Sequence, residues 1–98
     1  MATILLADDD AAVRDLVRRA LSAEGHTVHV TQDGLEALEF FNANGGPIDL
    51  LVTDVDMPQL DGISLAEKAL TAQSNLAVIL MSGFSDQLER AAGLRARR

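Results

Sequence analysis

The sequence predicts an α/β domain built around a parallel sheet. Short apolar runs alternate four times with segments of helical periodicity, and the connections between them are brief. The apolar residues are almost all aliphatic, because the chain has three Phe and no Trp or Tyr among its 48% hydrophobic residues. Such a composition suits parallel strands that helices cover on both faces. With 98 residues, the chain has room for a single domain, residues 1–98.

The first strand and helix are the most regular part of this pattern. Thr3 to Ala7 is an apolar run of strand length. From Asp10 the period changes to that of a helix, whose start is favoured by the aspartates and whose end is favoured by Gly25. One stripe of this helix is apolar: Val13, Leu16, Val17, Ala20 and Leu21.

The alternation continues along the rest of the chain. Strands are predicted over Thr27 to Thr31, Ile48 to Thr53 and Leu76 to Met81. Helices are predicted over Gly34 to Asn42, around residues 63–70, and over Ser85 to Ala92; Gly45-Gly46-Pro47 ends the first of them. The apolar faces of the first two of these helices comprise Leu35, Leu38 and Phe41, and Ile63, Ala66, Ala69 and Leu70.

Charge and composition exclude several classes of function. A formal net charge of −7 argues against direct binding of nucleic acid, and Arg95, Arg97 and Arg98 are interpreted as a solvated helix end. The absence of cysteine from the sequence excludes disulfides, thiolate catalysis and cysteine-ligated zinc. Because the chain has neither a basic N-terminal segment nor an apolar run of membrane-spanning length, we expect a cytoplasmic protein with no membrane partner.

Polar residues follow three of the predicted strands: Asp8-Asp9-Asp10, Asp54-Val55-Asp56 and Ser82-Gly83. The carboxyl ends of parallel strands lie along one edge of the sheet, where ligands bind in such folds. Carboxylates gathered there repel one another, and Mg²⁺ with its all-oxygen ligands would relieve that repulsion. Each segment alone has a simpler explanation, a helix cap for the first and turns for the others. Their common placement favours a site.

Three segments resemble the receiver domains of bacterial response regulators. Residues 4–10, Ile-Leu-Leu-Ala-Asp-Asp-Asp, resemble the opening strand and its acidic pair. Residues 50–58, Leu-Leu-Val-Thr-Asp-Val-Asp-Met-Pro, followed by Asp61-Gly62, resemble the phosphoacceptor segment and are the most specific of the three. Residues 79–83, Ile-Leu-Met-Ser-Gly, resemble the strand that ends in a hydroxyl residue and a small residue. The resemblance extends from residue 3 to about residue 90.

This resemblance implies the doubly wound, flavodoxin-like receiver fold, with strand order 2-1-3-4 in the part of the fold that the sequence contains. It implies a phosphoacceptor of a two-component system rather than an enzyme with turnover. The implied partners are a histidine kinase or phosphotransfer protein and an unidentified downstream protein target. The implied site residues are Asp54 as phosphoacceptor and metal ligand, Asp9 as direct Mg²⁺ ligand, Asp8 as ligand through water, Asp56 as ligand through its backbone carbonyl, Ser82 as hydrogen-bond donor to the phosphoryl group, and Gly83 as the small residue beside it.

The sequence departs from the family pattern near its end. A fifth strand that closes with a lysine before a proline is missing, and the lysine present, Lys68, falls in the third predicted helix. We therefore expect a C-terminally truncated receiver domain. The alternative is a short form that pairs the open apolar edge, Ala77 to Met81, with a second copy. The Asp56 carboxylate is expected either beside the phosphoryl group or in solvent. Arg14 is expected to pack on the surface, with partial compensation of the acidic charge as the alternative.

Two other functions remain open at this level. The Asp54-Val55-Asp56 segment also fits the nucleophile and acid/base pair of haloacid-dehalogenase-like phosphohydrolases, although that family carries the pair on its first strand. A pseudo-receiver, which folds and binds partners without taking up phosphate, is suggested by the missing lysine. The set of Asp8, Asp9, Asp54 and Ser82 argues against it.

Overall fold

The computed structural model describes residues 1–44 and 48–81. Strands and helices alternate along these residues, and the predicted helix over 85–92 lies outside them, as do Ser82 and Gly83. The elements are β1 (Thr3–Ala7), α1 (Ala11–Ala23), β2 (Thr27–Thr31), α2 (Gly34–Asn44), β3 (Leu50–Asp54), α3 (Gly62–Ala72) and β4 (Ala77–Met81).

The strands form one parallel sheet of order β2-β1-β3-β4, which confirms the predicted fold class and strand order. β3 begins at Leu50, two residues later than predicted. Just before it, the Asp49 side chain accepts the N–H of Thr3 at 2.7 Å. β3 also includes Asp54, which lies opposite Met81 of β4. In the described part of the chain β4 forms an edge of the sheet, and pairing of a second copy along it stays a prediction.

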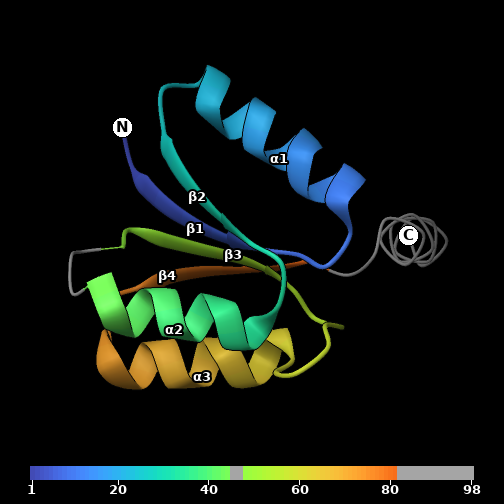
Figure 1. Ribbon diagram of the computed structural model, residues 1–98. Helices are drawn as coiled ribbons and strands as arrows, with labels where there is room; N and C mark the ends of the chain where they lie inside the picture. The colour runs from blue at the N-terminus through green and yellow to red at the C-terminus, as the bar shows by residue number, and fades with distance from the viewer. Residues whose placement is uncertain (45–47, 82–98) are drawn as a thin grey trace, which may run out of the picture.

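Helices cover both faces of the sheet (Figure 1). α2 and α3 lie side by side on one face of the sheet. They pack against strand side chains that point to that face, such as Leu5 of β1 and Leu51 of β3. α1 lies on the other face, where Val17 and Leu21 pack against a small cluster. That cluster contains the intervening strand residues: Ile4, Leu6 and Val52.

The buried faces of the helices differ from the predicted apolar stripes. Leu16 is 64% exposed, and Leu35, Ile63 and Leu70 are also exposed. Ala66 and Ala69 of α3 are buried as predicted, whereas Ala37 of α2 and Leu65 of α3 are buried although the predicted stripes did not include them. Small side chains let these two helices approach the sheet and each other closely, so their larger neighbours remain at the rim. No helix in the described ranges combines the length and apolar character needed to cross a bilayer.

Candidate functional site

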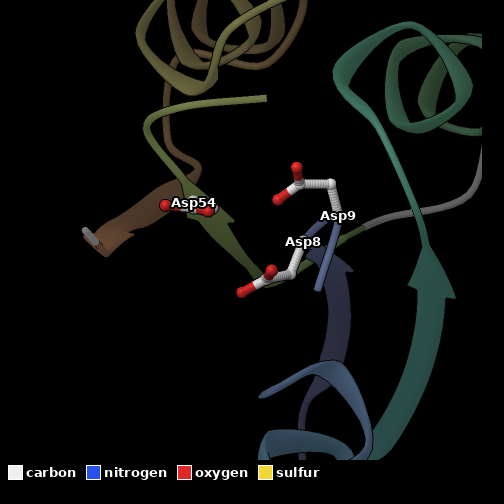
Figure 2. A group of neighbouring side chains, drawn as sticks. All are labelled: Asp8, Asp9 and Asp54. Carbon is white, nitrogen blue, oxygen red and sulfur yellow. The ribbon is translucent and has the colours of Figure 1, made fainter. Parts of the chain in front are cut away.

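The carboxyl edge of the sheet brings together Asp8, Asp9 and Asp54 (Figure 2). In the β1–β3 register Ala7 lies opposite Thr53, so the next residues along the two segments, Asp8 and Asp54, are neighbours. One carboxylate oxygen from each of the three aspartates lies within 4.8 Å of the other two. Asp8 and Asp54 are buried and Asp9 is exposed. The structure thus gathers three of the predicted site residues, while their roles stay predictions.

The aspartate run after β1 divides between two tasks. Asp10 is the N-cap of α1, and its side chain accepts from the backbone N–H of Ala12 at 2.9 Å and of Val13 at 3.3 Å. Asp8 and Asp9 belong to the carboxylate cluster. The helix-cap explanation is therefore confirmed for Asp10. The metal-site explanation stays a prediction for Asp8 and Asp9, whose carboxylates lie in the cluster.

Backbone and side-chain groups fix Asp8 at three points. Its N–H donates to the carbonyl of Thr31 at 3.2 Å, and its carboxylate accepts from the N–H of Asp10 at 2.8 Å. Its carbonyl accepts from a guanidinium nitrogen of Arg14 at 2.8 Å. The expectation that Arg14 only packs on the surface was wrong, since this half-buried side chain ties the first turn of α1 to the site.

Asp54 is fixed by its neighbours in β3 and at the start of α3. Its carboxylate accepts from the N–H of Val55 at 2.8 Å. Its backbone carbonyl accepts from the hydroxyl of Thr53 at 2.9 Å, and Thr53 is fully buried. The same carbonyl faces Gly62, where a Cβ would overlap its oxygen and lie 2.9 Å from its carbon. Only glycine lets α3 begin this close to Asp54.

Burial and mutual repulsion raise the pKa of both buried carboxyls. For Asp8, burial raises the pKa most, the N–H of Asp10 opposes this, and the charges of Asp9 and Asp10 add to it. For Asp54, burial again raises the pKa most, followed by the charge of Asp8, with the N–H of Val55 opposing. The site therefore holds negative charge that the local hydrogen bonds compensate only in part.

Other predicted residues lie apart from this cluster or outside the described residues. Asp56 is exposed, and its carboxylate is not part of the three-carboxylate group. The predicted role of its backbone carbonyl as a Mg²⁺ ligand stays a prediction. Lys68 is exposed on α3, and the predicted partners of the phosphoryl group, Ser82 and Gly83, lie outside the described residues.

Sequence reasoning missed Thr53 and Gly62 as residues that position the site. Thr53 was visible as a polar residue that follows the apolar run Leu50-Leu51-Val52 and directly precedes Asp54. Gly62 was noticed as part of a motif but not as a contact. Its closeness to Asp54 depends on the path of the intervening loop, which spacing alone does not determine.

Comparison with known proteins agrees with the fold and identifies the family. The family model for the response regulator receiver domain matches residues 4–97. Response regulator MprA of Mycobacterium sp. (strain KMS) is 42% identical over 93 residues, which cover 95% of this chain and 40% of MprA. Sensor kinase CckA of Brucella abortus (strain 2308) is 40% identical over 85 residues, covering 87% of this chain and 9% of the kinase.

A solved structure gives the same result. Response regulator protein TrrA from Thermotoga maritima, crystallised in complex with Mg²⁺ and BeF, superposes with a TM-score of 0.78 at 30% identity. The match covers 88% of this chain and 73% of that one. The chain spans about 40% of the length of the MprA relatives that it matches. Strand order, acidic edge and family model agree, and the chain belongs to the response regulator receiver domains of two-component systems.

Proposed function

We propose that this domain accepts a phosphoryl group on Asp54 with the help of Mg²⁺ bound at the acidic edge of the sheet. The observation that carries the proposal is the cluster of Asp8, Asp9 and Asp54, whose oxygens lie within 4.8 Å of one another with two of the three residues buried. A buried carboxylate pair without a cation is costly. The guanidinium of Arg14 donates to the backbone carbonyl of Asp8, and its charge only partly offsets the burial and the neighbouring aspartates that raise the pKa of Asp8.

The donor set fits a hard divalent cation. Carboxylate oxygens are the protein ligands that Mg²⁺ prefers, and it keeps several waters beside one or two of them. Asp9 and Asp54 would hold the ion directly, Asp8 would hold it through water, and Asp56 would contribute its backbone carbonyl. When bound, the ion would neutralise charge on the transferring phosphoryl oxygens.

The transfer itself would proceed on Asp54. A carboxylate oxygen of Asp54 attacks the phosphorus of the donor as the bond to the donor breaks, and the bonding electrons leave with the donor group. For a phosphohistidine donor the leaving atom is an imidazole nitrogen, which then takes a proton from solvent. The N–H of Val55 already donates to the Asp54 carboxylate at 2.8 Å and so orients its oxygens for the attack.

We infer that the donor is a histidine kinase or a phosphotransfer protein. The match to part of a sensor kinase from Brucella abortus supports a kinase as source, because a segment like this chain occurs within that protein. Phosphorylation would add roughly −1.5 to −2 charges beside Asp8 and Asp9. The Ser82 hydroxyl would donate to the new phosphoryl group, and the changed surface would be read by a downstream protein.

The test is incubation of the protein with acetyl phosphate or phosphoramidate plus Mg²⁺, followed by intact mass measurement. We expect a single phosphate adduct. It should not form when EDTA replaces Mg²⁺, and it should not form in Asp54→Ala. Asp56→Ala is the matched control, because it removes an exposed carboxylate two residues away and keeps the backbone carbonyl; it should retain the adduct. An adduct that persists in Asp54→Ala contradicts the proposal. Absence of any adduct favours a pseudo-receiver, and steady turnover of a phosphomonoester favours a phosphohydrolase.

A further inference from the structure

The segment between β3 and α3, residues 55–61, is held by a hydrogen bond where it joins α3. We call it the β3–α3 loop; it carries Asp56, whose backbone carbonyl is a predicted metal ligand. The N–H of Gly62 donates to the carbonyl of Val55 at 2.9 Å, which closes the loop on itself. The position of the Asp56 backbone therefore depends on how the rest of this loop is held.

A second contact, from α2, also restrains the β3–α3 loop. A Cβ built on Gly34, the first residue of α2, would overlap the carbonyl oxygen of Leu60 and lie 2.7 Å from the carbonyl carbon. Real Cβ atoms do not approach backbone atoms this closely, so the contact requires glycine. Gly34 is buried, and α2 and α3 run side by side (Figure 1). The start of α2 is thus pressed directly against the loop that leads from Asp54 into α3.

The loop contains a strained residue next to this contact. Gln59 has a φ of 73°, in the left-handed region that residues with a side chain rarely adopt. The N–H of Leu60 donates to the carbonyl of Pro58 at 2.8 Å, which makes Gln59 the centre of a tight three-residue turn. Backbone strain of this kind persists only where the surroundings hold it in place. The Leu60–Gly34 contact supplies that restraint on one side.

We propose that Gly34 is a positioning residue for the metal site, acting through Leu60 and the β3–α3 loop on the Asp56 backbone. The inference rests on the proposed function, because it assumes that the acidic edge binds Mg²⁺. A side chain at position 34 would push Leu60 away from α2 and shift the loop. Disturbing a residue that supports a metal ligand typically weakens binding by roughly 10- to 100-fold.

The test compares two glycine-to-alanine variants of the whole chain. Gly34→Ala should weaken Mg²⁺ binding by about 10-fold or more, measured by titration calorimetry. Gly25→Ala is the matched control: Gly25 has a φ of 90° and nothing within 4 Å of its would-be Cβ, so alanine strains the backbone far from any contact. Gly25→Ala should lower stability and leave the Mg²⁺ affinity within about twofold of the parent. Equal affinity losses in both variants would overturn the proposal.

A double variant separates position from stability. In Gly34→Ala/Gln59→Gly, glycine at position 59 lets the loop move away from the alanine at position 34 without backbone strain. The unfolding midpoint should therefore recover, at least in part, relative to Gly34→Ala alone. If Gly34 only supports folding, the Mg²⁺ affinity should recover with the stability. We expect instead that the affinity stays low, because the loop has settled elsewhere.

Titration of the parent protein completes the test and needs no substitution. Mg²⁺ should shift the amide resonances of Gly34 and Leu60 with the same Kd as those of Asp54 and Val55, and unchanged Gly34 and Leu60 signals would overturn the inference. If the parent binds no Mg²⁺ at all, the proposed function fails. If it binds Mg²⁺ through Asp54 and Gly34→Ala matches Gly25→Ala, only the positioning role fails.

Discussion

Asp8 and Asp54 combine burial with a neighbouring negative charge, and both effects act against their ionised forms. In the unfolded chain the same carboxyls ionise with an ordinary pKa of 3.8. Because the pKa is higher in the fold, the folded state binds protons more readily between that value and the raised one. Stability contributed by these groups therefore falls as the pH rises through this window, and the full penalty is present at neutral pH.

This sign predicts that Asp54→Asn stabilises the metal-free protein. The amide keeps the shape of the carboxyl without the charge that burial and Asp8 oppose. We expect a higher urea midpoint for Asp54→Asn than for the parent at about pH 7, measured in EDTA. The difference should shrink as the pH falls through the raised pKa of the parent carboxyl, which then takes up its proton. Asp56→Asn, at an exposed position, should leave the midpoint unchanged. A destabilised Asp54→Asn protein would contradict the electrostatic explanation.

Thr53 gives a second prediction at the scale of a single residue. Its buried hydroxyl donates to the Asp54 carbonyl at 2.9 Å, so Thr53→Val removes the donor and leaves that carbonyl poorly satisfied. The expected loss in the free energy of unfolding is about 1–3 kcal/mol. Thr71→Val is the matched control, because the Thr71 hydroxyl donates to the Glu67 carbonyl at 2.9 Å on an exposed helix surface. It should change the free energy of unfolding by less than about 0.5 kcal/mol in urea denaturation.

The residues of the site were predictable to different degrees. Asp8, Asp9 and Asp54 follow apolar strands, and the rule that parallel strands end at one edge is enough to bring them together. Thr53 acts through the carbonyl of its neighbour Asp54 in the same strand, and Gly34 acts through the carbonyl of Leu60 in another segment. Such contacts depend on the exact path of a loop, which hydrophobic periodicity does not encode.

At the scale of the element, the clearest test concerns the start of α1. Asp10 accepts from two backbone N–H groups that the helix itself cannot satisfy. Asp10→Ala should lower the free energy of unfolding by about 1 kcal/mol, whereas Asp10→Asn should nearly retain it, since asparagine caps equally well. Urea denaturation measures both. A loss of similar size in both variants would show that the charge of Asp10, rather than its capping bond, matters.

Element boundaries and faces were predicted less well than element order. β1 and β2 fall at the predicted residues because each apolar or β-branched run is bounded by polar residues. The predicted apolar stripe of α1 contains more residues than the sheet covers. Periodicity identifies the apolar positions of a helix but does not show which of them a neighbouring element buries. In α2 and α3 the alanines are buried and several leucines are not, because close packing against the sheet selects small side chains.

At the scale of the whole molecule, Mg²⁺ should act as a ligand of the folded state alone. Asp8 and Asp9 follow β1 whereas Asp54 ends β3, far away in the sequence, so the unfolded chain has no comparable site. At a Mg²⁺ concentration about 100 times the Kd, the folded state should gain about 2.7 kcal/mol, seen as a rise in Tm. Asp54→Ala should abolish the rise and Asp56→Ala should keep it. An equal rise in all three proteins would indicate general screening of the net charge of −7.

The fold as a whole was predictable because its signals agree. Aliphatic runs, helical periods and short connections each favour the same parallel sheet, and the observed order β2-β1-β3-β4 matches it. The sequence could not show how the loops set the fine geometry of the acidic edge. Two glycine contacts constrain the loops beside that edge: Gly62 with the carbonyl of Asp54, and Gly34 with the carbonyl of Leu60, 26 residues further along the chain.

The amides that hold the two buried carboxylates have a consequence for how this domain can diversify. The N–H of Asp10 orients Asp8, and the N–H of Val55 orients Asp54. A main-chain N–H is supplied by every residue except proline, so the side chain at position 55 is free to vary without loosening its grip on Asp54. Substitutions at position 55 and on the exposed helix faces should then leave the geometry of the two buried carboxylates unchanged, so that sequence can vary there without loss of the acidic cluster.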